Sequence, residues 1–406
     1  MVEIKNYGAK GDGITNDTAA VQAALDSGKV VHFTAGTYLC GTLYMRSNGG
    51  IHLDEDAVLL AIPGKENYNA DDFSPRNRVS VKEHASGAHF IIAEDCENIS
   101  ITGKGTIAGN YKTVFDLTKV DSYSRPHYAY PEWRMAQMIF IFGCKNVVIS
   151  DVLMCDPQYW TCFLLDCDDV NISKVRVRAD RLVMNADGID IDCCRNVRIT
   201  DCDIDCGDDC IALRANERHS MRVSPCDKVY VENCQLRSPA CAVRIGVGNG
   251  TLRNCHLKNL QMYDSSVGIG ICPSYTPGLC VNIENILFEN VTFEGDHAIM
   301  MLPMWGSVLL EDDPSIKPVK NITLRNFTGK CAAGSLIAAP AAKGVFSGIN
   351  LDNVKLTMAA EPQMLSEYRW PCEGYGVLNV YRMPELDTSG VTAVAEGGHD
   401  AVVHRP

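Results

Sequence analysis

Short alternating segments, most of them opened by an asparagine, recur along this chain and constrain its fold more than any other feature. Apolar and polar residues alternate within each segment, which is the period of a half-buried β-strand. Five of the seven intervals between the starts of successive segments are roughly 25 to 36 residues, and the other two are 48 and 57. Such uneven spacing is expected for coils of several short strands joined by turns of variable length. They are Asn98–Thr102, Asn146–Ser150, Asn171–Val175, Asn196–Thr200, Lys228–Glu232, Asn285–Glu289, Asn321–Arg325 and Gly348–Asp352.

This pattern predicts an all-β fold, a single right-handed parallel β-helix in which each coil stacks on the next. Stacking places β-branched residues, cysteines and asparagines in ladders inside the coil, while loops of any length project from the turns. A β-propeller would need a steadier period and aromatic marks in each blade, and the sequence has neither. We therefore expect one domain over 1–406, with an N-terminal cap over 1–45, coils over 46–358 and a C-terminal cap or tail over 359–406.

The N-terminal cap is expected to contain strands at Val2–Tyr7 and Val30–Phe33 and a short helix between them. The triplet Asn16-Asp17-Thr18 precedes alanines at helical spacing, which is typical of a capped helix start. The glycine-rich segment before it, GAKGDG, lacks the spacing of the known phosphate-binding loops. A helix that closes one end of the solenoid is the favoured interpretation.

The charge of the chain excludes two classes of partner. Its formal net charge is −13, whereas nucleic acids and anionic membranes are bound through excess lysine and arginine. We expect neither as a partner, and the oligomeric state is left open.

Nineteen cysteines are present, and an odd number cannot all pair within one chain. No apolar signal region precedes the first predicted strand, so the cysteines favour a reducing, cytoplasmic setting in which thiols serve as small core residues. The alternative is a secreted protein whose leader has been removed. No pair of CxxC elements supports a zinc site, and we expect no metal and no other cofactor.

Acidic residues crowd the stretch Asn185–Leu213, which holds eight aspartates in two strand-like runs. Asp187 precedes Gly188, and Asp208 and Asp209 follow Gly207 about one coil later. Since positions one coil apart lie over each other at about 5 Å, these three carboxylates can converge on one face. Two adjacent aspartates cannot both point outward from an ideal strand, so a bulge or turn is expected at 208–209. Asp201, Asp203 and Asp205 are interpreted as turn or solvated-face residues.

Three acids in one site hold at least one proton more tightly, which supplies a general acid beside ionised bases. Cleavage of a glycosidic bond needs this combination, because one acid protonates the leaving oxygen and another carboxylate activates water. Asp187, Asp208 and Asp209 are therefore the candidate catalytic residues of an enzyme acting on an oligosaccharide.

Aromatic and basic residues gather in two long interruptions of the repeat, where loops over a solenoid usually build the binding cleft. The segment 110–135 is interpreted as a cleft wall that stacks on sugar rings, although a packed surface loop would contain the same residues. The methionines of 298–318 are interpreted mainly as core filler. The candidate substrate-binding residues are Asn185, Trp160, Arg214, Arg244, His219, Tyr128, Trp133, Arg134 and Trp305. Arg214 and Arg244 are equally suited to pairing with aspartates.

At these residues the chain resembles glycoside hydrolase family 28, the polygalacturonase family of pectin-lyase-like β-helices. The opening NYGAKGDGITNDTAAVQAAL, the segment Asp156–Trp160 and the motifs NADGID and GDDCIA carry the resemblance. It implies that Asp208 is the general acid, and that Asp187 and Asp209 position and deprotonate the attacking water. It also implies inversion of the anomeric configuration, for which acid and base are about 6.5–9.5 Å apart. No metal is implied.

Two departures from the family pattern bear on the substrate. Where the family has Gly-His-Gly the chain has Ala240-Cys241-Ala242, and where the family has Arg-Ile-Lys it has Gly270-Ile271-Cys272. A buried sugar carboxylate needs charge-assisted partners, so a neutral or differently placed acidic sugar is a live alternative to galacturonate. The cations that could replace the missing ones are Arg214, Arg218, His219, Arg222 and Arg244.

The expected function is an inverting glycoside hydrolase that cleaves α-glycosidic bonds in pectin-derived or related oligosaccharides. An exo-acting enzyme is expected, since a cytoplasmic protein would meet imported fragments and a long loop could close one end of the cleft. Two alternatives use the same coil: a calcium-dependent pectate lyase, and a carbohydrate-binding solenoid without catalysis.

Overall fold

The computed structural model describes residues 1–69, 83–123, 125–217, 220, 222–276, 278–304, 315–340, 344–359, 376–396 and 401–405. These residues form two compact units. Unit 1 comprises Met1–Asp190, Cys194–Gly207 and His219–Met221, and unit 2 comprises Ile191–Cys193, Asp208–Arg218 and Arg222–Pro406. The predicted fold class is confirmed: the chain is nearly all β, and its strands pair in the long parallel ladders of a right-handed parallel β-helix. The assignment of 1–406 to one domain stays a prediction.

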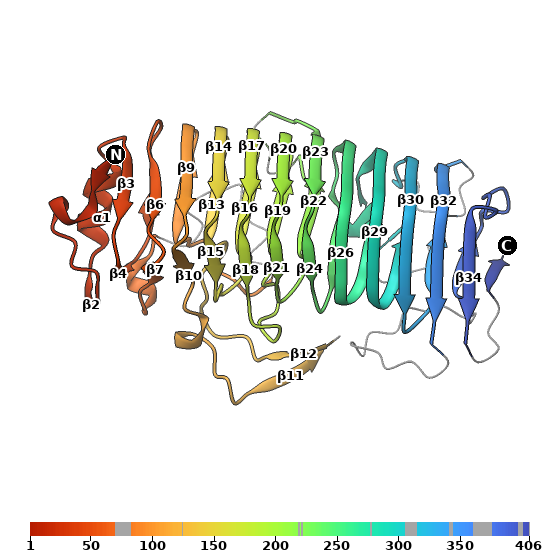
Figure 1. Ribbon diagram of the computed structural model, residues 1–406, viewed down its shortest axis with the longest axis horizontal. Coiled ribbons are helices and arrows are strands. Elements are labelled where there is room, and N and C mark those ends of the chain that lie inside the picture. The colour runs from red at the N-terminus through yellow and green to blue at the C-terminus, as the bar shows by residue number, and fades with distance from the viewer. Residues whose placement is uncertain are drawn as a thin grey trace. The chain divides into compact units, whose positions relative to one another are not determined.

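Unit 1 contains three parallel ladders, and Figure 1 shows four strands of the first ladder (β9, β14, β17 and β20) side by side. The first ladder consists of β1 (Val2–Glu3), β3 (Val30–Phe33), β6 (Gly50–Leu53), β9 (Glu97–Gly103), β14 (Lys145–Ser150), β17 (Asp168–Ser173) and β20 (Arg195–Thr200). The second consists of β2 (Asp12–Asn16), β4 (Gly36–Cys40), β7 (Ala57–Ala61), β10 (Thr106–Ala108), β15 (Leu153–Cys155), β18 (Arg176–Arg178) and β21 (Asp203–Asp205). The third consists of β5 (Leu43–Tyr44), β8 (Ile91–Glu94), β13 (Ile139–Phe142) and β16 (Cys162–Leu165), and is followed along the chain by β19 (Ile189–Asp192).

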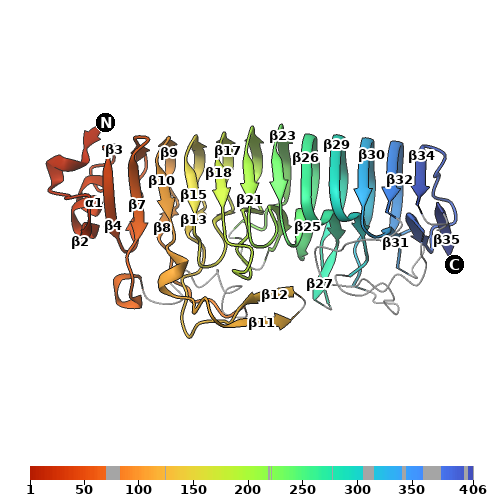
Figure 2. The ribbon, with the colours of Figure 1, turned by 60° about the horizontal axis from the view of Figure 1, so that its bottom comes forward.

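The strands of unit 1 also include an antiparallel hairpin, β11 (Val120–Tyr123) and β12 (Arg125–Tyr128), which Figure 2 shows as a separate pair. One α-helix, α1 (Thr18–Leu25), and three short 3₁₀ helices complete the described part of this unit. The 3₁₀ helices are η1 (Ile4–Tyr7), η2 (Lys65–Asn67) and η3 (Tyr111–Thr113). No helix in the described ranges is long and apolar enough to cross a membrane.

Unit 2 is built from longer strands, several of which bend and so take part in more than one ladder. They are β22 (Ile211–Ala215), β23 (Cys226–Glu232), β24 (Gln235–Arg237), β25 (Cys241–Gly248), β26 (Thr251–Cys272), β29 (Asn282–Met301), β30 (Val319–Cys331), β31 (Ser335–Ala338), β32 (Phe346–Met358), β33 (Leu378–Tyr381), β34 (Val391–Ala395) and β35 (Val402–Arg405). A short antiparallel pair, β27 (Ser274–Thr276) and β28 (Leu279–Cys280), follows β26. One of its ladders has the pairing order β22, β25, β26, β29, β31, β33, β35.

Isoleucines in register fill the interior of unit 1. Ile51, Ile101, Ile149, Ile172 and Ile199 are successive partners in the first ladder, and all are buried. Stacked β-branched side chains pack well on a pleated surface, which explains why the same alternating segment recurs. The predicted cysteine ladders are also present, since the Cys144 thiol accepts the N–H of Cys96 at 3.3 Å and the Cys194 thiol accepts that of Cys167 at 3.2 Å.

The repeating asparagines form ladders as predicted, but these lie on the surface and not inside the coil. Asn98 and Asn146 are exposed, have positive φ, and bond to each other through their amides at 2.7 Å. Asparagine tolerates the left-handed conformation better than other residues with a side chain. The expectation of interior asparagines was wrong because the residue takes the left-handed conformation near the start of each strand, as the second residue of β9 and of β14.

The N-terminal cap differs from the prediction in one element. The strand expected at Val2–Tyr7 stops at Glu3, and η1 follows because Ile4 turns into the core and Gly8 ends the turn at φ 88°. The helix and the strand Val30–Phe33 are confirmed. Asp17 precedes the helix, but its carboxylate accepts the N–H groups of Lys10 and Gly11 at 2.7 and 2.8 Å. The glycine-rich segment is thus held by the protein's own carboxylate.

Candidate active site

Asp187 lies in unit 1 directly before β19, in a buried turn that begins at Asp180. The backbone carbonyls of Asp187 and Gly188 accept the N–H groups of Thr161 and Cys162 at 2.9 and 3.1 Å. Asp187 is only 4% exposed. Parallel pairing with the strand before it therefore sets the position of the first candidate acid.

Arg134 is the centre of the network beneath this turn. Its guanidinium donates to the carbonyls of Glu83, His84, Gln158 and Met184 at 2.7 to 3.2 Å, and to the Asn185 Oδ1 at 3.3 Å. The residue is fully buried. Burial lowers the pKa of this guanidinium, but arginine remains charged in proteins. We predicted substrate binding for Arg134, and its surroundings correct this: its donors are used by the backbone, and it positions Asn185.

The loop predicted as a cleft wall packs against the same turn. Tyr128, Tyr111 and Phe115 form a buried cluster with Val183 and Ala186. The hydroxyls of Tyr111 and Tyr128 donate to Asp180 Oδ2 at 2.6 and 3.2 Å. Asp180 also accepts the Leu182 N–H at 2.9 Å, so the loop braces the segment that presents Asn185 and Asp187.

Gly207 connects this turn to the second acidic motif. Its N–H donates to the Ala186 carbonyl at 2.9 Å, and its own carbonyl accepts from Arg125 of the hairpin at 2.7 Å. A Cβ at this position would lie 2.5 Å from the Val183 carbonyl oxygen, so only glycine fits. Ala186 and Gly207 are therefore bonded neighbours, and each is followed in the sequence by a candidate acid.

Asp208 and Asp209 lie in unit 2, in the bend just before β22, as the alternation argument predicted. The Ser238 hydroxyl donates to the Asp208 carbonyl, and the Asp209 N–H donates to Asp208 Oδ1 at 3.1 Å. Asp208 is half-buried, so its carboxyl remains partly accessible. Ser238 also donates its N–H to Ser265 Oγ at 3.1 Å, which links the bend to the following coils.

Asp209 is more buried than Asp208 and has two partners on β25. Its Oδ1 accepts the Cys241 N–H at 3.1 Å, and its Oδ2 lies 4.0 Å from Arg244 Nη1. Burial raises the pKa of Asp209 and the neighbouring Asp208 raises it further, whereas Arg244 and the Cys241 N–H lower it. The two adjacent acids thus have different surroundings.

Arg214 is also buried and lies beside an acid of its own unit. Its Nε is 3.9 Å from Asp192 Oδ2, and Asp192 Oδ1 accepts the Asn216 N–H at 2.7 Å. Two of the three arginines predicted to bind substrate, Arg214 and Arg244, are therefore next to aspartates. Asp203 and Asp205, which were interpreted as turn or solvated-face residues, lie in β21 and pair with Arg178 and Arg181.

The remaining predicted binding residues fall in three groups. Trp160 is 2% exposed and stacks on Tyr159 with ring centroids 5.1 Å apart, so it is a core residue and its predicted contact with substrate is corrected. Tyr128 is corrected for the same reason, since its ring and hydroxyl are used in the loop cluster. Trp133 is half-buried against Tyr68 and lines a surface hollow of 490 Å³ with Tyr130. His219 and Trp305 lie outside the described residues.

Several residues of the site were not predicted from the sequence. Arg125 and Ser238 bond to Gly207 and Asp208 from positions distant in the sequence. Asp180 accepts hydrogen bonds at the start of the Asp187 turn, and Tyr275 packs on Arg244. Arg125 and Tyr111 belong to the loop that was singled out for its composition, but composition does not show which atoms meet. The methionines Met300 and Met301 are buried, as predicted for core filler.

The fold and the acidic motifs define a class of carbohydrate-active β-helix enzymes. The family model described as glycosyl hydrolases family 28 matches residues 69–372, and a model described as rhamnogalacturonase A/epimerase, pectate lyase-like, matches residues 1–49. The chain belongs to glycosyl hydrolases family 28 and is a glycoside hydrolase.

Related proteins and structures agree with this assignment. A probable polygalacturonase of Vitis vinifera is 25% identical over 389 residues, which cover 90% of this chain and 76% of the relative. An exo-poly-alpha-D-galacturonosidase of Dickeya chrysanthemi is 23% identical over 419 residues, covering 89% and 69%. The fold is similar to the exopolygalacturonase structure from Thermotoga maritima, with a TM-score of 0.67 at 16% identity, covering 100% of this chain and 91% of the other.

Proposed function

We propose that this enzyme hydrolyses α-glycosidic bonds in pectin-derived oligosaccharides with inversion of configuration, acting from chain ends. The observation that carries the proposal is the hydrogen bond from the Gly207 N–H to the Ala186 carbonyl. Asp187 directly follows Ala186, and Asp208 directly follows Gly207. Membership of family 28 supports the reaction type.

In this proposal Asp208 is the general acid and protonates the glycosidic oxygen. Asp187 and Asp209 hold the attacking water and take its proton, so the bond from the anomeric carbon to the leaving oxygen breaks as the bond to water forms. Asp208 is the more accessible member of the pair, which suits the group that must reach the leaving oxygen. Asn185 lies in the turn that carries Asp187, Arg244 lies beside Asp209, and Arg214 lies beside Asp192. All three are proposed to orient the sugar or the carboxylates.

The proposed substrate class is supported by the relatives. Those from Vitis vinifera and Dickeya chrysanthemi are named as acting on polygalacturonic acid, and the latter name specifies exo action. The proposal is wider than galacturonate itself, because Gly270 and Cys272 stand where the family has its two cations. We propose action at chain ends because the loop that contains Tyr111, Phe115 and Tyr128 packs on the turn that carries Asp187 in unit 1.

We also propose a reducing, cytoplasmic location. It is supported by the eighteen described cysteines, none of which forms a disulfide. Location in the cell is tested by fractionation of the native host.

The test of the proposed function is product analysis on a panel of oligogalacturonates and neutral α-glycosides, with and without chelator. We expect saturated products that grow one sugar at a time, unaffected by chelator, and a loss of at least about 100-fold in kcat for Asp208→Asn. The matched control is Asp203→Asn, an aspartate in an exposed ion pair with Arg178, which should retain activity.

Three results would contradict the proposal in different ways. Unsaturated products that require calcium would indicate the lyase. Binding without turnover, unchanged in Asp208→Asn, would indicate a carbohydrate-binding solenoid. Mixed internal fragments at early times would retain the hydrolase but exclude exo action.

A further inference from the structure

The two departures from the family pattern remove positive charge from β25 and β26. By the resemblance to family 28, Cys241 takes the place of the family histidine, and Gly270 and Cys272 take the places of its arginine and lysine. A thiol and a glycine cannot supply a cation, and burial raises the pKa of both thiols. Asp209 has nevertheless kept a cationic neighbour, because Arg244 lies three residues after Cys241.

The strand register explains how Arg244 fits there. It pairs with Ala212 of β22 on one side and with Gly270 of β26 on the other. Register partners in adjacent strands point to the same face about 5 Å apart. Two small neighbours leave room for one guanidinium, whereas an arginine at 270 would place a like charge beside it. A cation at 244 with glycine at 270 avoids this repulsion.

The guanidinium of Arg244 is held on both sides. Nη1 lies 4.0 Å from Asp209 Oδ2, and the side chain is 5% exposed. Its other face lies over the ring of Tyr275 at 5.3 Å, within the range of a cation–π interaction. A buried arginine packed between a carboxylate and an aromatic ring is fixed in direction, as a positioning residue must be.

We propose that Arg244 is a positioning residue that orients Asp209 and keeps it ionised, taking the part of the cations missing from Cys241 and Gly270. The inference rests on the proposed function, in which Asp209 acts as a base. It differs from the prediction that Arg244 binds substrate, because its partner here is a catalytic carboxylate.

The charges around Asp209 give the direction of the effect. Within unit 2, Asp208 faces it from the same bend, and the Cys241 thiol and Arg244 face it from β25. Burial and Asp208 raise the pKa of Asp209, and Arg244 is the main group that opposes them. Removal of Arg244 must therefore raise the pKa of Asp209 further. Since a base works only when ionised, activity at acidic pH should fall.

The first experiment measures this pKa without using catalysis. Carbon-13 carboxyl shifts of aspartate-labelled protein are followed with pH, and Asp209→Asn assigns the signal. We expect Arg244→Gln to raise the pKa of Asp209 by about one unit or more. Arg244→Lys keeps a shorter cation and should give a smaller rise of the same sign, so the inference stays testable if the glutamine variant does not fold.

The second experiment is the pH profile of kcat/KM for the same variants. We expect the acidic limb of Arg244→Gln to move to higher pH by the same amount, with about a tenfold loss of kcat/KM per unit below it. The matched control is Arg237→Gln, since Arg237 also pairs with an aspartate, Asp264, and lies 5.4 Å over a tyrosine ring, Tyr263. Its acidic limb should not move.

The outcomes test the role of Arg244 separately from the proposed hydrolase function. An Asp209 pKa that is unchanged in both Arg244 variants overturns the inference, as does a higher KM with an unmoved acidic limb, which would assign Arg244 to substrate. An Asp209 pKa that rises in a protein without hydrolase activity supports the inference about Arg244 while refuting the proposed function.

Discussion

Arg134 shows how one side chain can hold a candidate site together without taking part in its chemistry. Its hydrogen bonds reach carbonyls 24 to 51 residues away in the sequence, and it is fully buried. Arg134→Met leaves these carbonyls without a donor, and each unsatisfied buried group costs about 1–3 kcal/mol. We expect a loss of at least about 3 kcal/mol in the free energy of unfolding, measured by denaturant titration.

The control for this prediction is Arg195→Met, because Arg195 is half-exposed and pairs with Asp168 on the surface. Such pairs contribute about 0–1 kcal/mol. Equal losses for the two variants would contradict the role assigned to Arg134.

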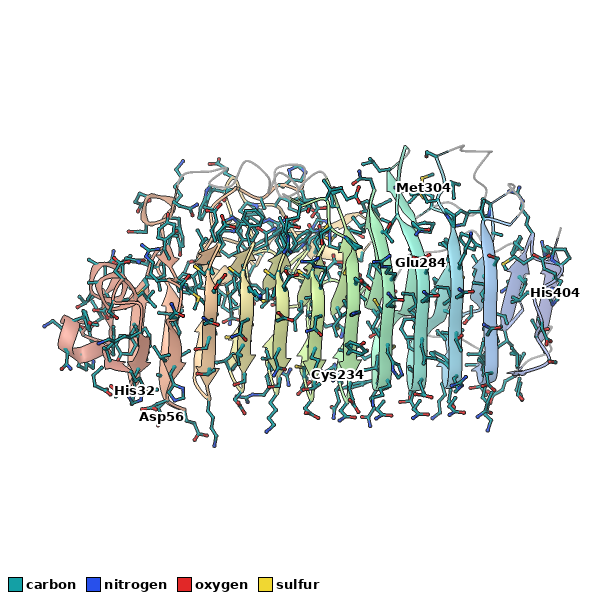
Figure 3. The ribbon with its side chains drawn as sticks, turned by 90° about the horizontal axis from the view of Figure 1, so that it is seen from above. His32, Asp56, Cys234, Glu284, Met304 and His404 are labelled. Carbon is teal, nitrogen blue, oxygen red and sulfur yellow. The ribbon has the colours of Figure 1, made fainter. Side chains whose placement is uncertain are left out.

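His32 provides a pH-dependent contribution to stability at the N-terminal end of unit 1, where Figure 3 labels it near Asp56. Its ring nitrogens lie 2.9 Å from Asp54 Oδ1 and 2.9 Å from Glu3 Oε1. Asp54 and then Glu3 raise its pKa above 6.5 in the folded protein. The stabilisation is therefore complete below pH 6.5 and is lost as the pH rises through the folded-state pKa.

The corresponding measurement is the free energy of unfolding of the wild type and of His32→Gln at pH 5.5 and pH 8.5. We expect the difference between the two proteins to be larger at pH 5.5. In a Glu3→Gln, Asp54→Asn background this pH dependence should disappear, and its persistence there would assign it to other groups.

At the scale of the element, asparagines of successive coils in unit 2 form a hydrogen-bonded ladder. The amide of Asn290 donates to Asn259 at 3.1 Å and accepts from Asn326 at 3.0 Å, with φ 56° at Asn290. Asn290→Ala loses both bonds and places an ordinary residue in a left-handed conformation, which costs about 1–2 kcal/mol. Asn290→Gly keeps the conformation and should lose less. Denaturant titration that gave the glycine variant the lower stability would contradict this account.

The elements show which parts of the structure could be predicted from the sequence. The strands Asn146–Ser150 and Asn196–Thr200 were predicted because alternation and a corner residue are local signals. The bend at Asp208 and Asp209 also followed from local geometry. The buried position of Trp160 and the contacts of Arg125 and Arg134 could not be predicted, since they depend on partners brought together by coil stacking. An aromatic loop has the same composition whether it lines a cleft or packs beneath one.

At the scale of the whole molecule, the reactivity of the cysteines tests the proposed reducing location. None of the eighteen described cysteines forms a disulfide, and burial raises the pKa of the Cys162 thiol to about 12. Thiolate is the reactive form, so a thiol reagent should modify the native protein slowly and the denatured, unreduced protein at all nineteen positions of the sequence. A lower titre in denaturant would reveal disulfides and contradict a reducing location.

The central claim is that three aspartates catalyse hydrolysis by direct attack of water. The most direct measurement is proton NMR of the product anomer during the first turnovers on an α-linked oligogalacturonate. We predict that the β-anomer forms first and then mutarotates, and that Asp208→Asn releases neither anomer on this time scale. Initial release of the α-anomer, or of an unsaturated sugar, would contradict the mechanism.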